Sequence, residues 1–353
     1  RLGMHVSLVQ RGDQLFSSVD TDVAAPIDDE LERHGVDVSL CDALMQACEG
    51  SHGRVTDVLT SEGAVPADLV VLAVGVRPNA GLARSAGVAL GETGAIAVDE
   101  HMRTNVPGVF SAGDCAEHWH RLLGRPAWVP LGTTANKQGR IAGRNAAGGE
   151  EAFSGILGTA ITRVFELEVA RTGFTEGEAK AEGLDCVAAT LDSRDHAGYM
   201  PGAKPLTIKL VAERGTGRLL GAQAVGRKGA DKRIDVAATA LFAGLTVEDL
   251  FRLDLELSPP FDGMRNTGVQ GADTTLLGRD LWRVRAWAGA QRRRKASAGR
   301  PTWSVSSIRT GSSVGGLELQ VVRDAARFWK PGNRKARETP AVVSCRKESV
   351  KSQ

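Results

Sequence analysis

The chain has 353 residues, of which 42% are apolar and 24% are charged. These proportions are typical of soluble globular proteins, and the length allows two or three domains with separate cores. No stretch approaches the roughly 20 apolar residues that a membrane span requires, so no membrane association is expected. The five dispersed cysteines form no CxxC pair and no metal-ligand spacing, which favours a reducing, cytoplasmic location and no metal site.

The net charge of +2 is the sum of two unlike regions. Residues 262–353 carry 19 Lys or Arg against 7 Asp or Glu, whereas residues 1–261 carry 25 against 35. The basic region is rich in Ser, Gly and Arg and shows little hydrophobic periodicity. Such a composition predicts a disordered basic tail over residues 263–353.

In chain order, the first part of the sequence alternates strand and helix patterns. We expect strands over residues 4–9, 36–40, 54–60, 68–74, 96–98 and 109–112, and helices over residues 21–34 and 132–147. The run over 68–74 is continuously apolar, which is typical of a strand buried on both faces. This order predicts an α/β sheet of the nucleotide-binding kind.

The pattern changes from about Phe153 onward. Strands are expected over residues 161–165, 168–171, 187–191, 207–211 and 219–225, and helices over 176–182, 231–243 and 247–252. Several of these strands are close enough in sequence to form hairpins. An α+β domain that ends near Phe261 is therefore predicted.

The strongest local motif is the string Thr104–Asp114, Thr-Asn-Val-Pro-Gly-Val-Phe-Ser-Ala-Gly-Asp. An apolar strand delivers Ala112, Gly113 and Asp114 at its carboxyl end, where open α/β sheets bind ligands. Gly113 lets a ligand approach the backbone, and Asp114 can accept hydrogen bonds from sugar or ribityl hydroxyls. A Gly-Asp pair taken alone is usually an ordinary turn. The whole string favours a binding role.

A second motif, Val129–Gly143, predicts a helix that begins near Gly132. The N–H groups and positive dipole end of that helix, around Leu131, Gly132, Thr133 and Thr134, would point above the sheet. Reduced flavin carries negative charge near its pyrimidine carbonyl, so such a helix end favours the reduced form. The alternative is an ordinary helix capped by Thr133 or Thr134. Together the two motifs favour flavin.

These two strings, with Ala73–Asn79, resemble the pyridine nucleotide-disulfide oxidoreductase superfamily, and most of all its coenzyme A disulfide reductase and NADH oxidase branch. The resemblance covers about residues 2–261. It implies a Rossmann-like NAD(P)-binding portion (1–99), a returning portion of the FAD domain (100–150) and an α+β dimerisation domain (151–262). It also implies the cofactors FAD and NADPH or NADH, a coenzyme A-type disulfide substrate and a homodimer.

The resemblance also implies roles for single residues. Asp195–Gly202 is similar to the segment that carries an active-site tyrosine, which is Tyr199 here, while Asn136 and Arg265 match positions of substrate contact. Leu257 stands where the family has a second tyrosine. The family's first FAD-binding glycine loop, its redox cysteine and the glycine loop expected before Leu2 are not found. We therefore expect a fragment that is inactive by itself.

Nucleotide binding is expected where the strand over 4–9 ends. Gln10 and Arg11 follow that strand, and the family string places Gly75 at the same site. Gln10 does not repel a 2′-phosphate, and Arg11 can pair with one, so NADPH is expected to bind at least as well as NADH. Alternatively, Arg11 is a solvated loop residue and both cofactors are used.

Two other functions compete with disulfide reduction. An NADH oxidase or peroxidase uses the same scaffold and passes electrons to oxygen or peroxide. A non-enzymatic dimerisation remnant, whose basic tail attracts nucleic acid, belongs to a different class; a solvated tail is the commoner origin of such a run, so nucleic-acid binding is not expected. His118 and His120 lie near Cys115 without further zinc ligands, and we interpret them as a pair of loop histidines.

Overall fold

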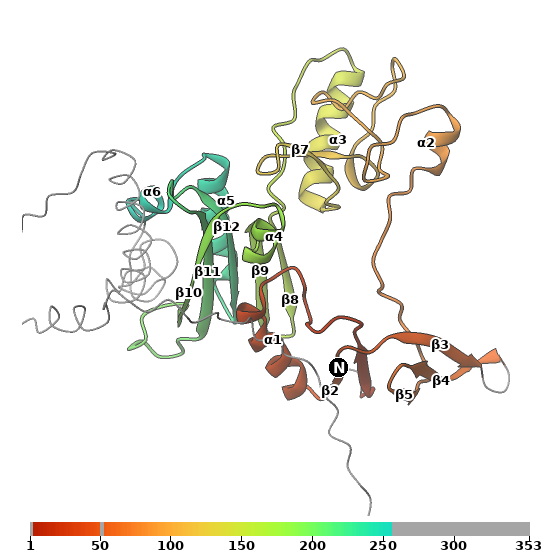
Figure 1. Cartoon of the computed structure of the whole chain (residues 1–353), viewed down its shortest axis with the longest axis vertical. Helices are drawn as coiled ribbons and strands as arrows, with labels where there is room; N and C mark the ends of the chain where they lie inside the picture. The colour runs from red at the N-terminus through yellow and green to blue at the C-terminus, as the bar shows by residue number, and fades with distance from the viewer. Residues whose placement is uncertain (1–2, 50–52, 256–353) are drawn as a thin grey trace, which may run out of the picture. The chain divides into compact units, whose positions relative to one another are not determined.

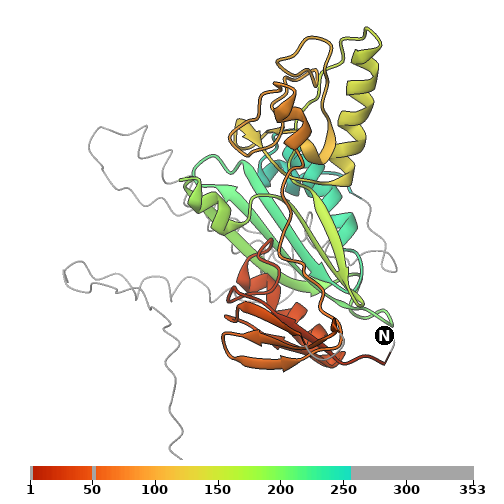
Figure 2. The ribbon, with the colours of Figure 1, turned by 90° about the vertical axis from the view of Figure 1, so that its right-hand side faces the viewer.

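The computed structural model describes residues 3–49 and 53–255 and shows a mixed α/β chain (Figures 1 and 2). The elements before residue 150 are β1 (Val6–Val9), α1 (Thr21–Arg33), β2 (Val36–Ser39), β3 (Leu44–Glu49), β4 (Val55–Thr60), β5 (Gly63–Pro66), α2 (Gly81–Ser85), the 3-10 turn η2 (Gly113–Cys115), β6 (His118–His120), β7 (Arg125–Ala127) and α3 (Gly132–Ala146). The later elements are β8 (Ala160–Val164), β9 (Leu167–Gly173), α4 (Glu176–Ala181), β10 (Cys186–Arg194), β11 (Pro205–Glu213), β12 (Leu219–Gly226), α5 (Ala230–Phe242) and α6 (Val247–Phe251).

The first unit is a β-α-β unit in which α1 connects two parallel strands. β1 and β2 pair in register from Val6 opposite Val36 to Val9 opposite Ser39. Apolar side chains recur along α1 at Val23, Ile27 and Leu31, and all three are buried. The helix ends where Gly35 takes a positive φ of 71°. The expected strand, helix and strand over this region are confirmed.

A three-stranded antiparallel sheet follows, in the order β3, β4, β5. Only β4 matches a strand expected from the sequence. The sequence does not predict β3 and β5, because neither has enough apolar–polar alternation to stand out from the turns around it.

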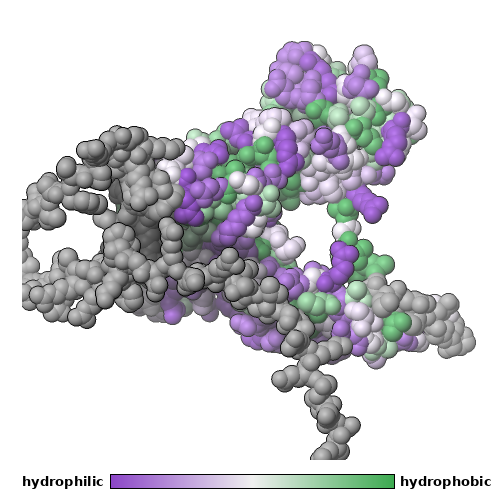
Figure 3. Space-filling view, in the orientation of Figure 1, coloured by the Kyte–Doolittle hydropathy of each residue, from purple (hydrophilic) through white to green (hydrophobic). Residues whose placement is uncertain are grey.

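The expected strand over residues 68–74 is wrong. This segment between β5 and α2 pairs with no strand in the described part of the chain, and the exposed fractions of Leu69, Val71, Leu72 and Val74 range from 65% to 84%. Figure 3 shows strongly hydrophobic residues on the surface of this stretch. The backbone N–H and C=O groups of a fully buried strand must form hydrogen bonds with neighbouring strands. An apolar run in the sequence does not show whether such neighbours exist.

Residues 80–157 form two small cores around α3 and the chain that precedes it. One contains Met102, Ile141, Phe153 and Ile156, and the other contains Ala80, Val88 and Ile96. The strands expected over 96–98 and 109–112 are reduced to isolated bridges, Ile96 with Ala116 and Arg103 with Phe110. The helix expected over 132–147 is confirmed as α3.

The later elements form one five-stranded antiparallel sheet in the order β10, β11, β12, β9, β8. Each of its strands and all three helices were expected from the sequence. Along β11, Leu206, Ile208 and Leu210 pack with α5 and α6 on one face. Lys209 and Val211, which alternate with these residues along β11, face the other side of the sheet, where α1 and α4 pack.

Candidate functional site

The Gly113–Asp114 pair forms a tight turn against α3. Gly113 has a φ of 76°, and a Cβ on it would lie 3.2 Å from the Cβ of Ala135. Its N–H donates to Oε1 of Gln138 at 2.9 Å, and Gln138 is fully buried. Only glycine accommodates both the positive φ and this close approach of α3. Asp114 remains exposed and is able to accept hydrogen bonds.

The amino-terminal end of α3 is open. Leu131 is the N-cap residue and makes no side-chain cap hydrogen bond, and the first intrahelical bond runs from the N–H of Ala135 to the oxygen of Leu131. The N–H groups of Gly132, Thr133 and Thr134 therefore precede the helix's own bonds. The alternative of a helix capped by the side chain of Thr133 or Thr134 is therefore wrong. Such an end attracts negative charge.

Two buried residues behind this turn were not identified as part of the site. Glu117 accepts hydrogen bonds from the N–H and the hydroxyl of Thr93. His118 is almost fully buried, and Gln138 is a polar neighbour of its ring. Burial lowers the pKa of His118, so the ring is neutral at pH 7.

The prediction of loop histidines is wrong for both members of the pair. His118 and His120 lie on β6, and both are buried, with the ring of His120 stacked on that of Phe174 at 5.6 Å between centroids. A three-residue strand is too short to give a period in the sequence. Within residues 3–49 and 53–255, no group of three His, Cys, Asp or Glu side chains is placed to hold a metal ion.

The expected nucleotide residues lie as a short turn after β1. The N–H of Gln10 donates to the oxygen of Ser39 at 2.8 Å, and its oxygen accepts from the N–H of Asp42 at 3.1 Å. Arg11 is exposed at the next position. Gly75 is also exposed, with a φ of 101°, in the unpaired segment between β5 and α2. The backbone of Gln10 is therefore fixed by hydrogen bonds to the segment after β2.

The residues expected to contact substrate lie in three places. Tyr199 is in the loop between β10 and β11, is 67% exposed and makes no hydrogen bond within the described residues. Asn136 is exposed on α3, where its Oδ1 accepts from Arg140 at 3.2 Å. Arg265 lies outside the described residues, as do Leu257 and the expected tail over 263–353.

The loop that carries Tyr199 has a firm base. Asp195 and Lys204 exchange two hydrogen bonds across it, from the N–H of Asp195 to the oxygen of Lys204 and from the N–H of Lys204 to Oδ1 of Asp195. Burial alone would raise the pKa of Asp195, but the bond from Lys204 and the contact with His196 lower it below its ordinary value. The tip of the loop with Tyr199 is thus presented from a rigid base.

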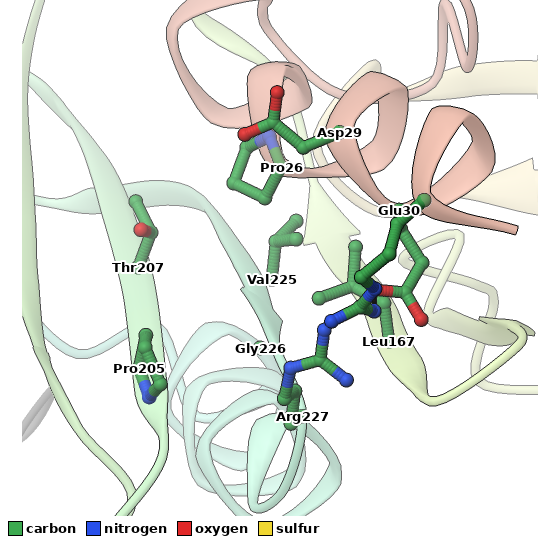
Figure 4. A pocket seen from close by; sticks show the side chains of 10 residues that line it. Pro26, Asp29, Glu30, Leu167, Pro205, Thr207, Val225, Gly226 and Arg227 are labelled. Carbon is green, nitrogen blue, oxygen red and sulfur yellow. Dashed lines mark hydrogen bonds and ion pairs between the residues drawn. The ribbon is translucent and has the colours of Figure 1, made fainter.

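The structure also contains a cavity of about 380 Å³ between α1 and the five-stranded sheet (Figure 4). It is lined by Pro26, Asp29, Glu30, Arg33, Leu167, Pro205, Thr207, Val225, Gly226 and Arg227. None of the residues expected to bind flavin, nucleotide or substrate lines it. The Glu30 carboxylate binds both Arg33 and Arg227, so the two guanidinium groups are already paired.

Comparisons with known proteins place the chain in one family. Residues 1–139 match the family described as pyridine nucleotide-disulphide oxidoreductase, and residues 159–268 match the dimerisation domain of the same family.

No helix in the described residues is long and apolar enough to cross a membrane.

Curated relatives and a solved structure agree with this match. The chain is 43% identical over 260 residues to an NAD(P)H sulfur oxidoreductase (CoA-dependent) of Pyrococcus abyssi, which covers 73% of this chain and 57% of that protein. It is 31% identical over 261 residues to a coenzyme A disulfide reductase of Staphylococcus epidermidis, covering 73% and 58%. An NAD-dependent persulfide reductase from A. fulgidus has the same fold, with a TM-score of 0.75 and 36% identity over 79% of this chain and 52% of that one. The chain thus spans a little over half the length of these relatives.

Proposed function

Because the chain belongs to the pyridine nucleotide-disulphide oxidoreductase family, we propose that the protein is an FAD-dependent NAD(P)H oxidoreductase that reduces a coenzyme A-type disulfide or persulfide. The observation that carries the proposal is the contact of Gly113 with α3. This contact places the exposed carboxylate of Asp114 beside the uncapped amino-terminal end of α3. The relatives named for coenzyme A-dependent sulfur and disulfide reduction support the substrate class.

The residues present fit FAD. A Cβ at position 113 would press against Ala135, so glycine is what allows the turn to lie directly against the first turn of α3. Asp114 would accept hydrogen bonds from the ribityl chain, with the backbone of Ala112 and Gly113 beside it. The free N–H groups of Gly132, Thr133 and Thr134 would face the negative edge of the reduced ring. The chemistry that bound FAD would supply is two-electron transfer from NAD(P)H to a disulfide.

The overall reaction is balanced for a symmetrical disulfide. One NAD(P)H and one proton reduce one coenzyme A disulfide to two thiols, with NAD(P)⁺ as the oxidised product. We propose that Gln10 and Arg11 bind the adenosine ribose of the nucleotide. The redox cysteine that the family employs corresponds to none of the five cysteines in residues 1–353.

Tyr199 is proposed as the proton donor of the thiol half-reaction. When the sulfur–sulfur bond breaks, the departing thiolate needs a hydrogen-bond donor or an acid, and a phenol supplies either. Tyr199 is exposed at the tip of its loop, as a residue that serves the site of a second subunit would be. The fixed base formed by Asp195 and Lys204 supports such a presentation.

The proposal is tested by stoichiometry in the FAD-loaded full-length enzyme, because residues 1–353 span only 57% and 58% of the length of the two relatives. With coenzyme A disulfide and no oxygen, two thiols should appear for each NAD(P)H consumed. Tyr199→Phe should lower kcat for the disulfide by about 10²-fold or more, while the flavin spectrum and its reduction by NAD(P)H stay unchanged. Met200→Leu, a volume-conserving change at the next position, serves as the control. NAD(P)H consumption that requires oxygen and yields no thiol would show the oxidase alternative instead.

A further inference from the structure

Lys209 is a charged residue at an unusual place, the middle of a central strand. It lies on β11, is only 4% exposed, and points to the face of the sheet that α1 and α4 cover. Its Nζ lies 2.8 Å from Oδ1 of Asp22, 2.9 Å from Oε2 of Glu176 and 3.2 Å from Oδ2 of Asp20. A single buried ammonium thus binds three carboxylates from two helix amino-terminal ends.

The rest of the cluster is satisfied by polar groups of the sheet and α4. Gln223 on β12 donates to Asp20 and accepts from its N–H, and the N–H of Glu176 also donates to Asp20. The hydroxyl of Thr190 on β10 donates to Asp22 at 2.6 Å. Three carboxylates and one ammonium are tolerated here because every acceptor has donors.

The charges depend on one another. Burial alone would lower the pKa of Lys209, but its bonds with Asp22 and Glu176 and the charge of Asp20 raise it above its ordinary value. The bonds from Lys180 and Lys209 lower the pKa of Glu176, against a smaller opposing effect of burial. Lys209 and Glu176 are therefore ionised at pH 7. Removal of the ammonium would leave the carboxylates of Asp20, Asp22 and Glu176 facing one another.

A continuous set of hydrogen bonds connects this cluster with the turn after β1. Thr21, between the two aspartates, donates its hydroxyl to Oε1 of Gln14 at 2.6 Å. Gln14 in turn donates to the oxygen of Val19 at 2.7 Å. The side chain of Gln10 donates to the oxygen of Gln14 at 3.4 Å. Lys209, which lies 187 positions from Asp22 in the chain, thus fixes the segment 10–22 at its Asp22 end.

The other end of α1 has its own ionic contact with the sheet. Arg227, which follows β12, binds Oε2 of Glu30 at 2.7 Å (Figure 4). The apolar contacts of Val23, Ile27 and Leu31 with Val169 and Val225 hold the middle of the helix. Loss of the Lys209 ammonium should therefore release the amino-terminal end of α1 and the preceding turn, while the rest of the helix stays docked.

We propose that Lys209 is a positioning residue for nucleotide binding: by holding Asp20 and Asp22 against the five-stranded sheet, it fixes the turn that presents Gln10 and Arg11 to NAD(P)H. This proposal rests on the proposed function, which assigns Gln10 and Arg11 to the nucleotide. The ligand class is a nicotinamide dinucleotide with or without a 2′-phosphate. Lys209 itself does not touch the nucleotide.

The test uses Lys209→Met in the FAD-loaded full-length holoenzyme, with Lys180→Met as the matched control. Lys180 binds the other oxygen of the same Glu176 but is exposed, and its ion pair is with α4 only among the described residues. Lys209→Met should raise KM for NADPH by roughly threefold to tenfold, with kcat at saturating nucleotide unchanged. Lys180→Met should change neither constant. A contribution of Lys209 to overall stability alone would not produce this separation of KM from kcat.

Hydrogen exchange gives a second readout that does not depend on activity. In Lys209→Met, the amides of Gln10, Cys41 and Asp42 should exchange faster, whereas those of the Glu30 end of α1 should not. Should Lys209→Met fail to fold, Asp22→Asn removes one carboxylate, keeps the ammonium paired and should give the same changes at smaller size.

The outcomes separate the two levels of the proposal. If Arg11→Ala weakens NADPH binding but Lys209→Met leaves both KM and amide exchange unchanged, the positioning role of Lys209 is refuted. An Arg11→Ala protein with unchanged binding of NADPH and NADH would refute the nucleotide assignment and the proposal with it. Equal losses of kcat and affinity in Lys209→Met would also refute positioning, because they indicate general damage.

Discussion

Arg233 on α5 donates a hydrogen bond to the main-chain oxygen of Asp195, with 2.9 Å between Nη2 and the oxygen, and both residues are buried. The same guanidinium reaches the oxygen of Gly229 at 3.4 Å. The helix on one face of the sheet is therefore connected directly to the base of the loop that carries Tyr199.

The first prediction concerns this contact. Arg233→Met should lower the free energy of unfolding by about 1–3 kcal/mol, because it leaves a buried carbonyl without its donor. Arg194→Met is the control, since Arg194 donates to the oxygen of Ala203 in the same loop but is exposed. This change should lower the free energy of unfolding by about 0.5 kcal/mol or less, as most surface substitutions do. Urea unfolding measures both, and equal costs would contradict the role of burial.

The second prediction concerns the turn at Gly113. Gly113→Ala should destabilise the protein by about 1–3 kcal/mol, because alanine must adopt a positive φ and meet Ala135. It should also weaken FAD retention, measured by flavin release on dilution. Gly139→Ala is the control: this position lies inside α3 with no atom within 4 Å of a built Cβ, so alanine should stabilise by about 0.5–1 kcal/mol.

The third prediction is a pH dependence. Oδ1 of Asp28 is buried without a hydrogen-bond partner in the described residues, and burial, together with the charges of Asp29 and Glu32, raises the pKa of Asp28. A raised carboxyl pKa means that the ionised form is disfavoured in the folded state, so Asp28 destabilises the fold at neutral pH. Asp28→Asn should therefore raise Tm at pH 7.

The direction of the pKa shift determines how the gain in Tm from Asp28→Asn varies with pH. The gain should shrink as the pH falls through the raised pKa of Asp28 and vanish below 3.8, where the carboxyl is protonated in the folded and the unfolded state. Melting curves between pH 3 and 8 check this course, with the exposed Glu92→Gln as the control. A gain that is constant with pH would show that the amide acts through shape and not through charge.

The fourth prediction is cofactor choice. Arg11→Ala should weaken NADPH binding by about 1.5–3 kcal/mol, the value of a hydrogen bond to a charged group, and should leave NADH binding nearly unchanged. Binding titrations with both nucleotides measure the difference, with the exposed Arg84→Ala as the control. Equal losses for the two nucleotides, or a wild-type preference for NADH of about tenfold, would contradict recognition of a 2′-phosphate.

The fifth prediction is self-association. Residues 159–268 match a dimerisation domain, so the protein should sediment as a dimer at micromolar concentration. Removal of the residues after Arg265 should leave the dimer intact, because the sequence there has no pattern that could form a core. A strict monomer, or a dimer that dissociates on this truncation, would contradict the prediction.

The sequence was most informative where structure is local. The helices α3 and α5 and the five strands from β8 to β12 were located to within a few residues. Their patterns of apolar residues are local properties of the sequence. The Gly113–Asp114 turn and the open end of α3 were likewise identified as a pair from two strings of residues. Both depend on backbone conformations that glycine and the start of a helix impose locally.

Only the tertiary structure decided the long-range relationships. The apolar run over 68–74 has the composition of a buried strand, yet no strand pairs with it in the described residues, because pairing depends on neighbours and not on its own side chains. Lys209 stands in a sequence of alternating residues where a solvent-facing lysine is the ordinary expectation. It is buried because Asp20, Asp22 and Glu176 converge on it from positions that are distant in the chain. The sequence by itself thus determined the elements and the glycine turn, whereas the burial of a charge was decided by the packing of α1 and α4 on the sheet.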